Sequence, residues 1–525
     1  MKRMLLMALM ALGAAACEKG FSAVDDQPAD DVRLLPHDMI VLGSKLEDPY
    51  TVANMTRALD ALYPTRARQE PLRPTHLYVR FLPHDRSEYD RLEEMGVELF
   101  DHPLDYEIVR EGDYYHDPDV RTGDITWQYA VVDEGFVFPA NIIYELLDEC
   151  YIADALKPTR AADGIDWELV ERESYRLTGN ADRLPERTRD GETSAIPFGR
   201  ITIRDEQYDS EPVGVAGVRV SCNSFVKVDH AFTDEGGYYV MDKSFSSKVR
   251  YRLIFKNRKG FGIGFNLILI PASSSTLGRQ DPGGLDVTVD RNSDRSLFAR
   301  CVVNNAGYDY FNSCSVNSQK MKAPPANLRI WIFHNLAASS AVMLQQGALI
   351  DRSVIGEYLG EYTTLLKAFL PDVTLGLRNA TDYASIYAVA IHELAHASHF
   401  AQVGTDYWGP YIRFILKSYV SSSGITYGVG TEADHGYCEV GEMWAYYLQT
   451  RLYRERYPES NAVFGTSYWF SPQILLYMDD RGLDRFRLFQ AFTSEVRDRD
   501  ALEQKLLSLY PEQRAIITQA FARYN

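Results

Sequence analysis

Apolar residues between positions 75 and 196 come in short runs that alternate between two spacings. Runs with a period of two predict strands, and apolar residues three or four apart predict helices. The expected elements are a strand at 77–81, a helix at 87–95, a strand at 97–100, a strand in ITWQYAVV and a helix in NIIYELLDECYIADAL. Residues 17–74 precede them as a polar tether with one helix near 52–62. A tether and a small α+β unit are therefore expected.

Residues 197–290 have a different pattern, with short β-rich segments separated by Gly, Asp and Asn turns. Strands are expected in GRITIR, VRVSC, YRLIFKN and GLDVTV. Short strands at close, regular intervals are typical of an all-β sandwich. We therefore expect a sandwich to follow the N-terminal unit.

From 291 to 525 the pattern is first α+β and then helical. Strands are expected at 326–333 and 373–377, with an amphipathic helix at 354–369 between them. The stretch NATDYASIYAVAIHELAHASHF has Thr381 or Asp382 as a cap and no Gly or Pro before Gly404, which predicts a long helix. Beyond residue 436 the apolar spacing is helical. The whole chain should therefore be a multidomain α+β protein.

The first sixteen residues predict a secretory signal peptide. Lys2 and Arg3 precede an apolar run that is too short to span a bilayer, and small residues follow it. The segment ends at Cys17 and resembles the lipobox of bacterial lipoproteins, in which this cysteine becomes the lipidated first residue. That resemblance implies export to the cell envelope and a membrane anchor at Cys17, with the outer membrane or the cell surface as the expected location.

The charge and the cysteine content limit the binding partners and metal sites to be expected. A formal net charge of -18 argues against nucleic acid, because phosphate binding needs clustered basic residues that the sequence lacks. With Cys17 set aside, five of the six cysteines remain. Cys301 and Cys314 flank a stretch rich in turn residues and are candidates for a disulfide, while free buried thiols are expected elsewhere. No Cys-x-x-Cys pair is present, so no cysteine zinc site is expected.

The predicted long helix contains the pattern His-Glu-x-x-His. His392 and His396 are one turn apart on one face, which suits two nitrogens binding one Zn²⁺ at about 2.0–2.1 Å. Glu393 lies about 100° round the helix, where its carboxylate can take a proton from the water that zinc activates. The metzincin pattern does not fit, because His399 stands where it needs Gly and Gln402 where it needs His.

Two acids, Glu439 and Glu442, lie on a second predicted helix and could complete the zinc shell. Their distance from the first helix resembles that in the gluzincins, whose third zinc ligand is a Glu on a later helix. The segment EMWA that starts at Glu442 looks like the form found in the lethal-factor-like branch. The likeness implies Glu442 as third ligand, with Glu439 as the alternative. It also implies an oxyanion donor, for which Tyr437 and His435 are the candidates.

A second resemblance covers the predicted sandwich. The run GRITIRDEQYDSEPVGVAGVRVSC and the later TDEGGYY are similar to carboxypeptidase regulatory-like, transthyretin-like modules, which position neighbouring domains and rarely carry catalysis. Together the resemblances imply a lipid-anchored zinc metallopeptidase that hydrolyses protein or peptide substrates. Two alternatives stay open: a surface-binding lipoprotein with an inactive zincin domain, and a zinc amidase acting on cell-wall bonds.

Overall fold

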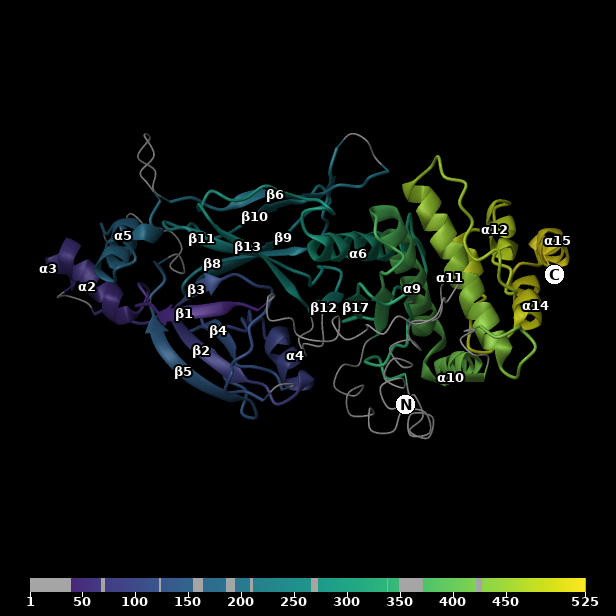
Figure 1. Cartoon of the computed structure of the whole chain (residues 1–525), viewed down its shortest axis with the longest axis horizontal. Coiled ribbons are helices and arrows are strands. Elements are labelled where there is room, and N and C mark those ends of the chain that lie inside the picture. Colours follow the sequence, from purple (N-terminus) through teal and green to yellow (C-terminus); the bar gives the residue numbers. More distant parts are fainter. Residues whose placement is uncertain are drawn as a thin grey trace.

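The computed structural model describes residues 39–67, 71–121, 124–153, 164–185, 194–207, 211–265, 272–337, 339–348, 372–421 and 427–524. It is a mixed α+β structure with several sheets, elongated in the view of Figure 1. The N-terminal unit lies at one end, two sheets follow in the middle, and the C-terminal helices lie at the other end. The predicted signal peptide, Cys17 and the tether up to residue 38 lie outside the described residues.

The N-terminal unit is built on a three-stranded antiparallel sheet in the order β4-β2-β5. Asp85 caps α4 by accepting the backbone N–H of Glu88 at 3.1 Å. Buried Val79 and Phe81 on β2 pack with Leu92 of α4. The elements are β1 (Val41–Lys45), α2 (Val52–Leu62), α3 (Pro64–Ala67), β2 (His76–Leu82), α4 (Arg86–Glu94), β3 (Tyr106–Arg110), β4 (Gln128–Asp133), β5 (Ile143–Cys150) and α5 (Trp167–Leu177).

Two predictions for this unit are wrong. A helix is expected at 141–156, because apolar pairs recur four residues apart, yet Ile143–Cys150 forms β5, and 154–156 lie outside the described residues. That strand pairs with β2 along its whole length, so tertiary pairing overrides a helical spacing. Residues 97–100 form no strand, and only Phe100 makes a bridge, to Tyr129. The helices at 52–62 and 87–95 and the strands at 77–81 and in ITWQYAVV are confirmed within a few residues.

Two four-stranded sheets follow, with orders β10-β6-β14, where β7 also pairs with β6, and β13-β11-β8-β9. Ile201 and Ile203 of the first sheet and Tyr251 and Leu253 of the second are fully buried in one core. The strands are β6 (Phe198–Ile203), β7 (Val213–Gly214), β8 (Arg219–Ser224), β9 (Lys227–Phe232), β10 (Tyr238–Val240), β11 (Val249–Ile254), β13 (Ser274–Gln280) and β14 (Val287–Val289). The predicted β-rich segments are confirmed as strands.

The next sheet is parallel, in the order β12-β17-β18. Its members are β12 (Gly262–Phe265), β17 (Arg329–Phe333) and β18 (Val373–Gly376), which confirms the strands expected at 326–333 and 373–377. β12 comes from the segment assigned to the sandwich, and the chain then returns to the two preceding sheets through β13 and β14. The helix expected at 354–369 lies outside the described residues.

Helix α6 (Arg295–Ser313) packs against α9 (Tyr383–Val403). Because α6 spans Arg295–Ser313, the stretch between Cys301 and Cys314 is helical, although its composition suggested turns. All five described cysteines are free and buried, so the disulfide candidate is wrong. The remaining elements are β15 (Ser315–Val316), β16 (Gln319–Lys320), α10 (Thr405–Ser421), α11 (His435–Arg456), α12 (Gln473–Asp479), α13 (Arg485–Phe489), α14 (Arg499–Leu509) and α15 (Arg514–Arg523).

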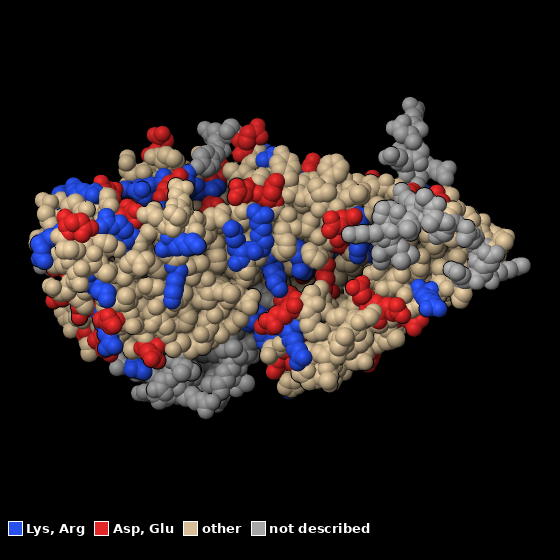
Figure 2. All heavy atoms as spheres, turned by 180° about the vertical axis from the view of Figure 1, so that it is seen from behind, with Lys and Arg blue, Asp and Glu red and all other residues tan. Residues whose placement is uncertain are grey.

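The surface carries charges of both signs. On the face shown in Figure 2, basic and acidic side chains are interspersed over much of the molecule. Among the described helices, none combines the length and apolar character needed to cross a membrane.

Candidate metal centre

The helix α9 begins and ends at well-defined caps. Asp382 accepts the backbone N–H of Ser385, and the Ser385 side chain completes a capping box. Gly404 follows the last turn with a φ of 79°, a left-handed conformation that favours glycine. The helix is almost entirely buried, including His392, Glu393 and His396. The caps set the bounds of the helix. Within it, the spacing of four residues places His392 and His396 on one face, as expected.

Helix α11 packs antiparallel to α9 (Figure 1). His392 faces Gln449, whereas His396, further along α9, faces Glu442, earlier on α11. The order of contacts is therefore reversed between the helices. This antiparallel packing brings a carboxylate from α11 to the two imidazoles of α9.

The three side chains converge on one point. His392 Nε2 lies 3.2 Å from His396 Nε2 and 3.4 Å from a Glu442 oxygen, and His396 Nε2 lies 3.4 Å from the other Glu442 oxygen. In a tetrahedral zinc site with bonds of about 2.0–2.1 Å, neighbouring ligand atoms lie about 3.3–3.4 Å apart. Within the described chain, His392, His396 and Glu442 are the group whose donor atoms could hold a metal ion.

The protonation of the donors suits a cation. Burial opposes ionisation of Glu442, but the neighbouring His396 and His392 hold its pKa well below the usual value. Burial lowers the pKa of His392, which favours its neutral form. An ionised Glu442 and a neutral His392 are the forms in which these two side chains bind a metal ion. The Nδ1 atom of His396 is buried and has no hydrogen-bond partner among the described residues.

Polar side chains around the triad fix its orientation. The amide oxygen of Gln449 lies 3.2 Å from His392 Nδ1, and a proton on this nitrogen would donate to that oxygen and leave the Nε2 lone pair facing the centre. Tyr411 donates to one Glu442 oxygen at 2.7 Å, and Tyr427 donates to the other at 3.2 Å. The ring of Tyr446 packs edge-on against His392, with centroids 4.4 Å apart. Side chains outside the triad therefore orient both His392 and Glu442.

The alternative acid, Glu439, has another partner. Its Oε1 lies 2.7 Å from Arg499 Nε, in an ion pair between α11 and α14. Glu439 lies about one turn before Glu442 and is paired with Arg499, not with the histidines. Of the two acids weighed from the sequence, Glu442 is the one that the structure brings to the triad.

The sequence also named Glu393, Tyr437 and His435 as candidates, and their surroundings differ. Glu393 is fully buried, and it adds a small electrostatic contribution to the raised pKa of Tyr411, which is due first to burial and then to Glu442. Tyr437 packs against Tyr407, with ring centroids 4.8 Å apart. His435 Nδ1 lies 2.7 Å from the carbonyl oxygen of Glu432. In the part of the chain described, neither Tyr437 nor His435 hydrogen-bonds to the triad.

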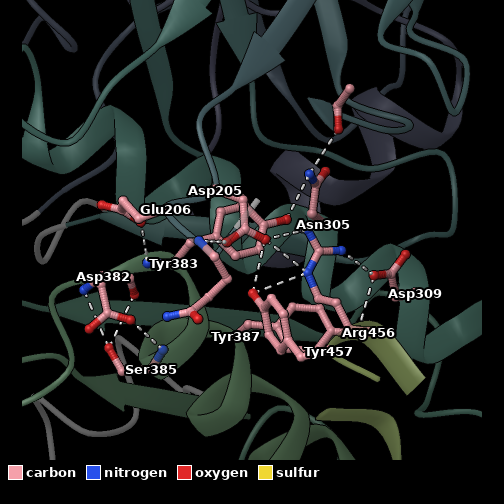
Figure 3. Close-up of polar contacts among 12 residues, drawn as sticks. Asp205, Glu206, Asn305, Asp309, Asp382, Tyr383, Ser385, Tyr387, Arg456 and Tyr457 are labelled. Atoms are coloured by element: carbon pink, nitrogen blue, oxygen red, sulfur yellow. Dashed lines mark hydrogen bonds and ion pairs between the residues drawn. The ribbon is translucent and has the colours of Figure 1, made fainter. Parts of the chain in front are cut away.

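A polar cluster beyond the triad fixes the register of the two helices (Figure 3). Arg456, at the end of α11, contacts Asp205 at 2.9 Å and Asp309 of α6 at 3.3 Å. Its guanidinium lies over the rings of Tyr383 and Tyr387 of α9, at 4.4 and 4.9 Å from their centroids. The cluster thus connects α9, α11, α6 and the segment after β6, and anchors the helix pair that carries the triad.

Sequence reasoning missed Tyr411, Tyr427 and Gln449. The sequence pattern gives no signal for them, because each becomes a polar support of the triad only through packing. Comparison of the chain with family models, with curated proteins and with solved structures finds no match. The candidate centre is therefore defined by the geometry of the triad itself.

Proposed function

We propose that the protein is an exported, lipid-anchored zinc metallopeptidase of the gluzincin type. The observation that carries this proposal is the convergence of His392, His396 and Glu442 at separations of 3.2 to 3.4 Å. Two imidazoles and one carboxylate are a donor set typical of catalytic zinc, which keeps its fourth position for water or substrate. When bound there, zinc would polarise the scissile carbonyl and activate a water for attack.

The chain's own residues take the remaining roles in this proposal. Glu393, next to His392 on α9, accepts the proton of the attacking water and passes it to the leaving amine. Gln449 keeps the His392 tautomer that exposes Nε2, and Tyr411 and Tyr427 orient the Glu442 carboxylate. Tyr437 and His435 remain the sequence-based candidates for an oxyanion donor, and they require a rearrangement to reach the triad.

The burial of the centre favours a second candidate. Glu393 and Glu442 have no exposed surface, and His396 is 2% exposed. A peptide must reach these groups to be cleaved, so the described conformation has to open for catalysis. A metal centre that stays closed would instead stabilise a surface-binding lipoprotein with an inactive zincin domain.

Peptide hydrolysis distinguishes the two candidates. We expect the zinc-loaded protein to cleave members of a mixed peptide library, to lose this activity on chelation and to regain it with stoichiometric zinc. Cell-wall fragments provide a parallel substrate set for the amidase alternative. Zinc-loaded protein that cleaves neither set would favour the surface-binding candidate.

The proposed anchor has its own test. Cys17→Ser should move the protein from the membrane fraction to the soluble fraction, because lipid on Cys17 is the proposed attachment. Fractionation followed by immunoblotting measures the distribution, with the unaltered chain as control. Membrane retention of the variant at the level of the control would contradict lipid anchoring through Cys17.

A further inference from the structure

The N-terminal unit contacts the rest of the chain through a series of acid–base pairs as well as apolar residues. In the pairs that follow, residues before 197 supply the acid and residues after it supply the base. They are Glu111–Arg250 at 2.7 Å, Asp113–Arg300 at 2.9 Å, Asp90–Arg329 at 2.9 Å, Glu93–Lys256 at 3.0 Å and Glu171–Lys227 at 3.0 Å. The interface therefore matches each of these cations with a carboxylate.

Arg252 is an exception within this interface. It lies on the central strand β11, is 4% exposed, and its guanidinium packs over the ring of Phe100 at 4.3 Å. Its Nε and Nη2 atoms are buried and have no hydrogen-bond partner among the described residues. Burial and the charge of Arg250 lower the pKa of Arg252 to about 10, so it is still cationic at neutral pH. Asp101 and Glu98 of the N-terminal unit attract this cation, but its buried N–H donors still lack an acceptor, which is costly.

A cavity of about 40 Å³ lies beside this guanidinium, between the N-terminal unit and the sheet. Arg219 also lines it, and its buried Nε has no hydrogen-bond partner in the described chain, with Glu98 at 4.0 Å as the nearest carboxylate. One water needs roughly 10–15 Å³ by this measure. The space therefore suits a chloride ion or a carboxylate no larger than acetate.

Two carboxylates on the cavity wall oppose an anion, and both are partly neutralised. Glu93 forms the ion pair with Lys256, and Asp101 accepts the backbone N–H of Tyr115 at 2.6 Å. Burial raises the pKa of Asp101, and the hydrogen bond from Tyr115 and the charges of Arg252 and Arg250 act against that rise. The N–H groups of Arg252 and Arg219 are the donors left for a ligand.

We infer that this cavity binds one small monovalent anion, chloride or a short carboxylate, between Arg252 and Arg219. The anion would supply the hydrogen-bond acceptor that the described residues do not provide to Nε and Nη2 of Arg252. It would thereby strengthen the docking of that unit on the sheet, independently of any metal at His392, His396 and Glu442.

Bromide diffraction tests the site directly. Crystals of the unaltered protein grown with sodium bromide should show an anomalous peak within hydrogen-bonding distance of Nε or Nη2 of Arg252. Ordered water at that position, with no anomalous signal, would overturn the inference. This measurement needs no variant, so it stands even where substitutions impair folding.

Thermal unfolding gives the second readout. Replacing gluconate by chloride or acetate at constant ionic strength should raise the midpoint by about 1–3 °C as the site saturates. Arg252→Met keeps the stem over Phe100 but removes the donors, and should abolish the rise. Arg80→Met removes a cation paired with Glu145 at 2.6 Å, outside the cavity, and should keep it. A rise that survives in Arg252→Met, or none in the unaltered protein, would contradict the inference.

Discussion

Glu442→Ala is expected to lower zinc affinity by about 100-fold or more, whereas Glu439→Ala is expected to change it by less than about threefold. The two acids are one turn apart on α11, so the substitutions are matched in chemistry and helix context. Glu442 lies 3.4 Å from both imidazoles, whereas Glu439 is paired with Arg499. Removal of a metal ligand should lower zinc affinity by more than the factor of about 10–100 that is typical when a residue supporting a ligand is changed.

A chelator titration followed by metal analysis compares the variants under one condition. Circular dichroism controls for folding, because Glu442→Ala also removes the acceptor of Tyr411 and Tyr427, and Glu439→Ala removes an interhelical ion pair. Zinc loss in Glu439→Ala together with zinc retention in Glu442→Ala would show that the third ligand is one turn away from the position assigned here.

Glu393→Gln is expected to lower peptide hydrolysis by about 10²–10⁴-fold while leaving the zinc content unchanged. The substitution is isosteric and removes the proposed base, but it alters none of His392, His396 and Glu442. Glu393 is fully buried, and an amide of the same shape preserves the packing of α9. Turnover of a cleaved library peptide and zinc per chain should be measured on the same preparation.

Glu439→Gln serves as the control, because it neutralises a nearby buried acid that has no assigned part in proton transfer. It should retain most of the activity. If Glu393→Gln hydrolyses the peptide at the rate of the unaltered protein, Glu393 is not the base, and another group must handle the proton.

The elements that carry the candidate centre could be predicted because their signals are local. The His-Glu-x-x-His spacing, the Asp382 cap and the absence of Gly or Pro before Gly404 fix α9 from within its own sequence. The choice between Glu439 and Glu442 could not be derived from spacing, since both lie on α11 within one turn. The antiparallel packing of α11 on α9 separates them.

Other features depend on partners that are distant in sequence. The spacing of Ile143–Cys150 suits a helix, and pairing with β2 makes it a strand. Residues 301–314 contain turn formers, yet burial against the core makes them helical. Tyr411 and Gln449 support the triad only through tertiary contacts. Each of these outcomes is decided by packing, which a single sequence does not encode in a local pattern.

Zinc analysis of the purified protein tests the central claim most directly. The account predicts about one zinc ion per chain in the unaltered protein. It predicts almost none in His392→Ala and His396→Ala, each of which removes one of the nitrogens that lie 3.2 Å apart. Folded protein that holds no zinc across several preparations, and takes up none when zinc is added, would contradict the assignment of His392, His396 and Glu442 as a metal centre.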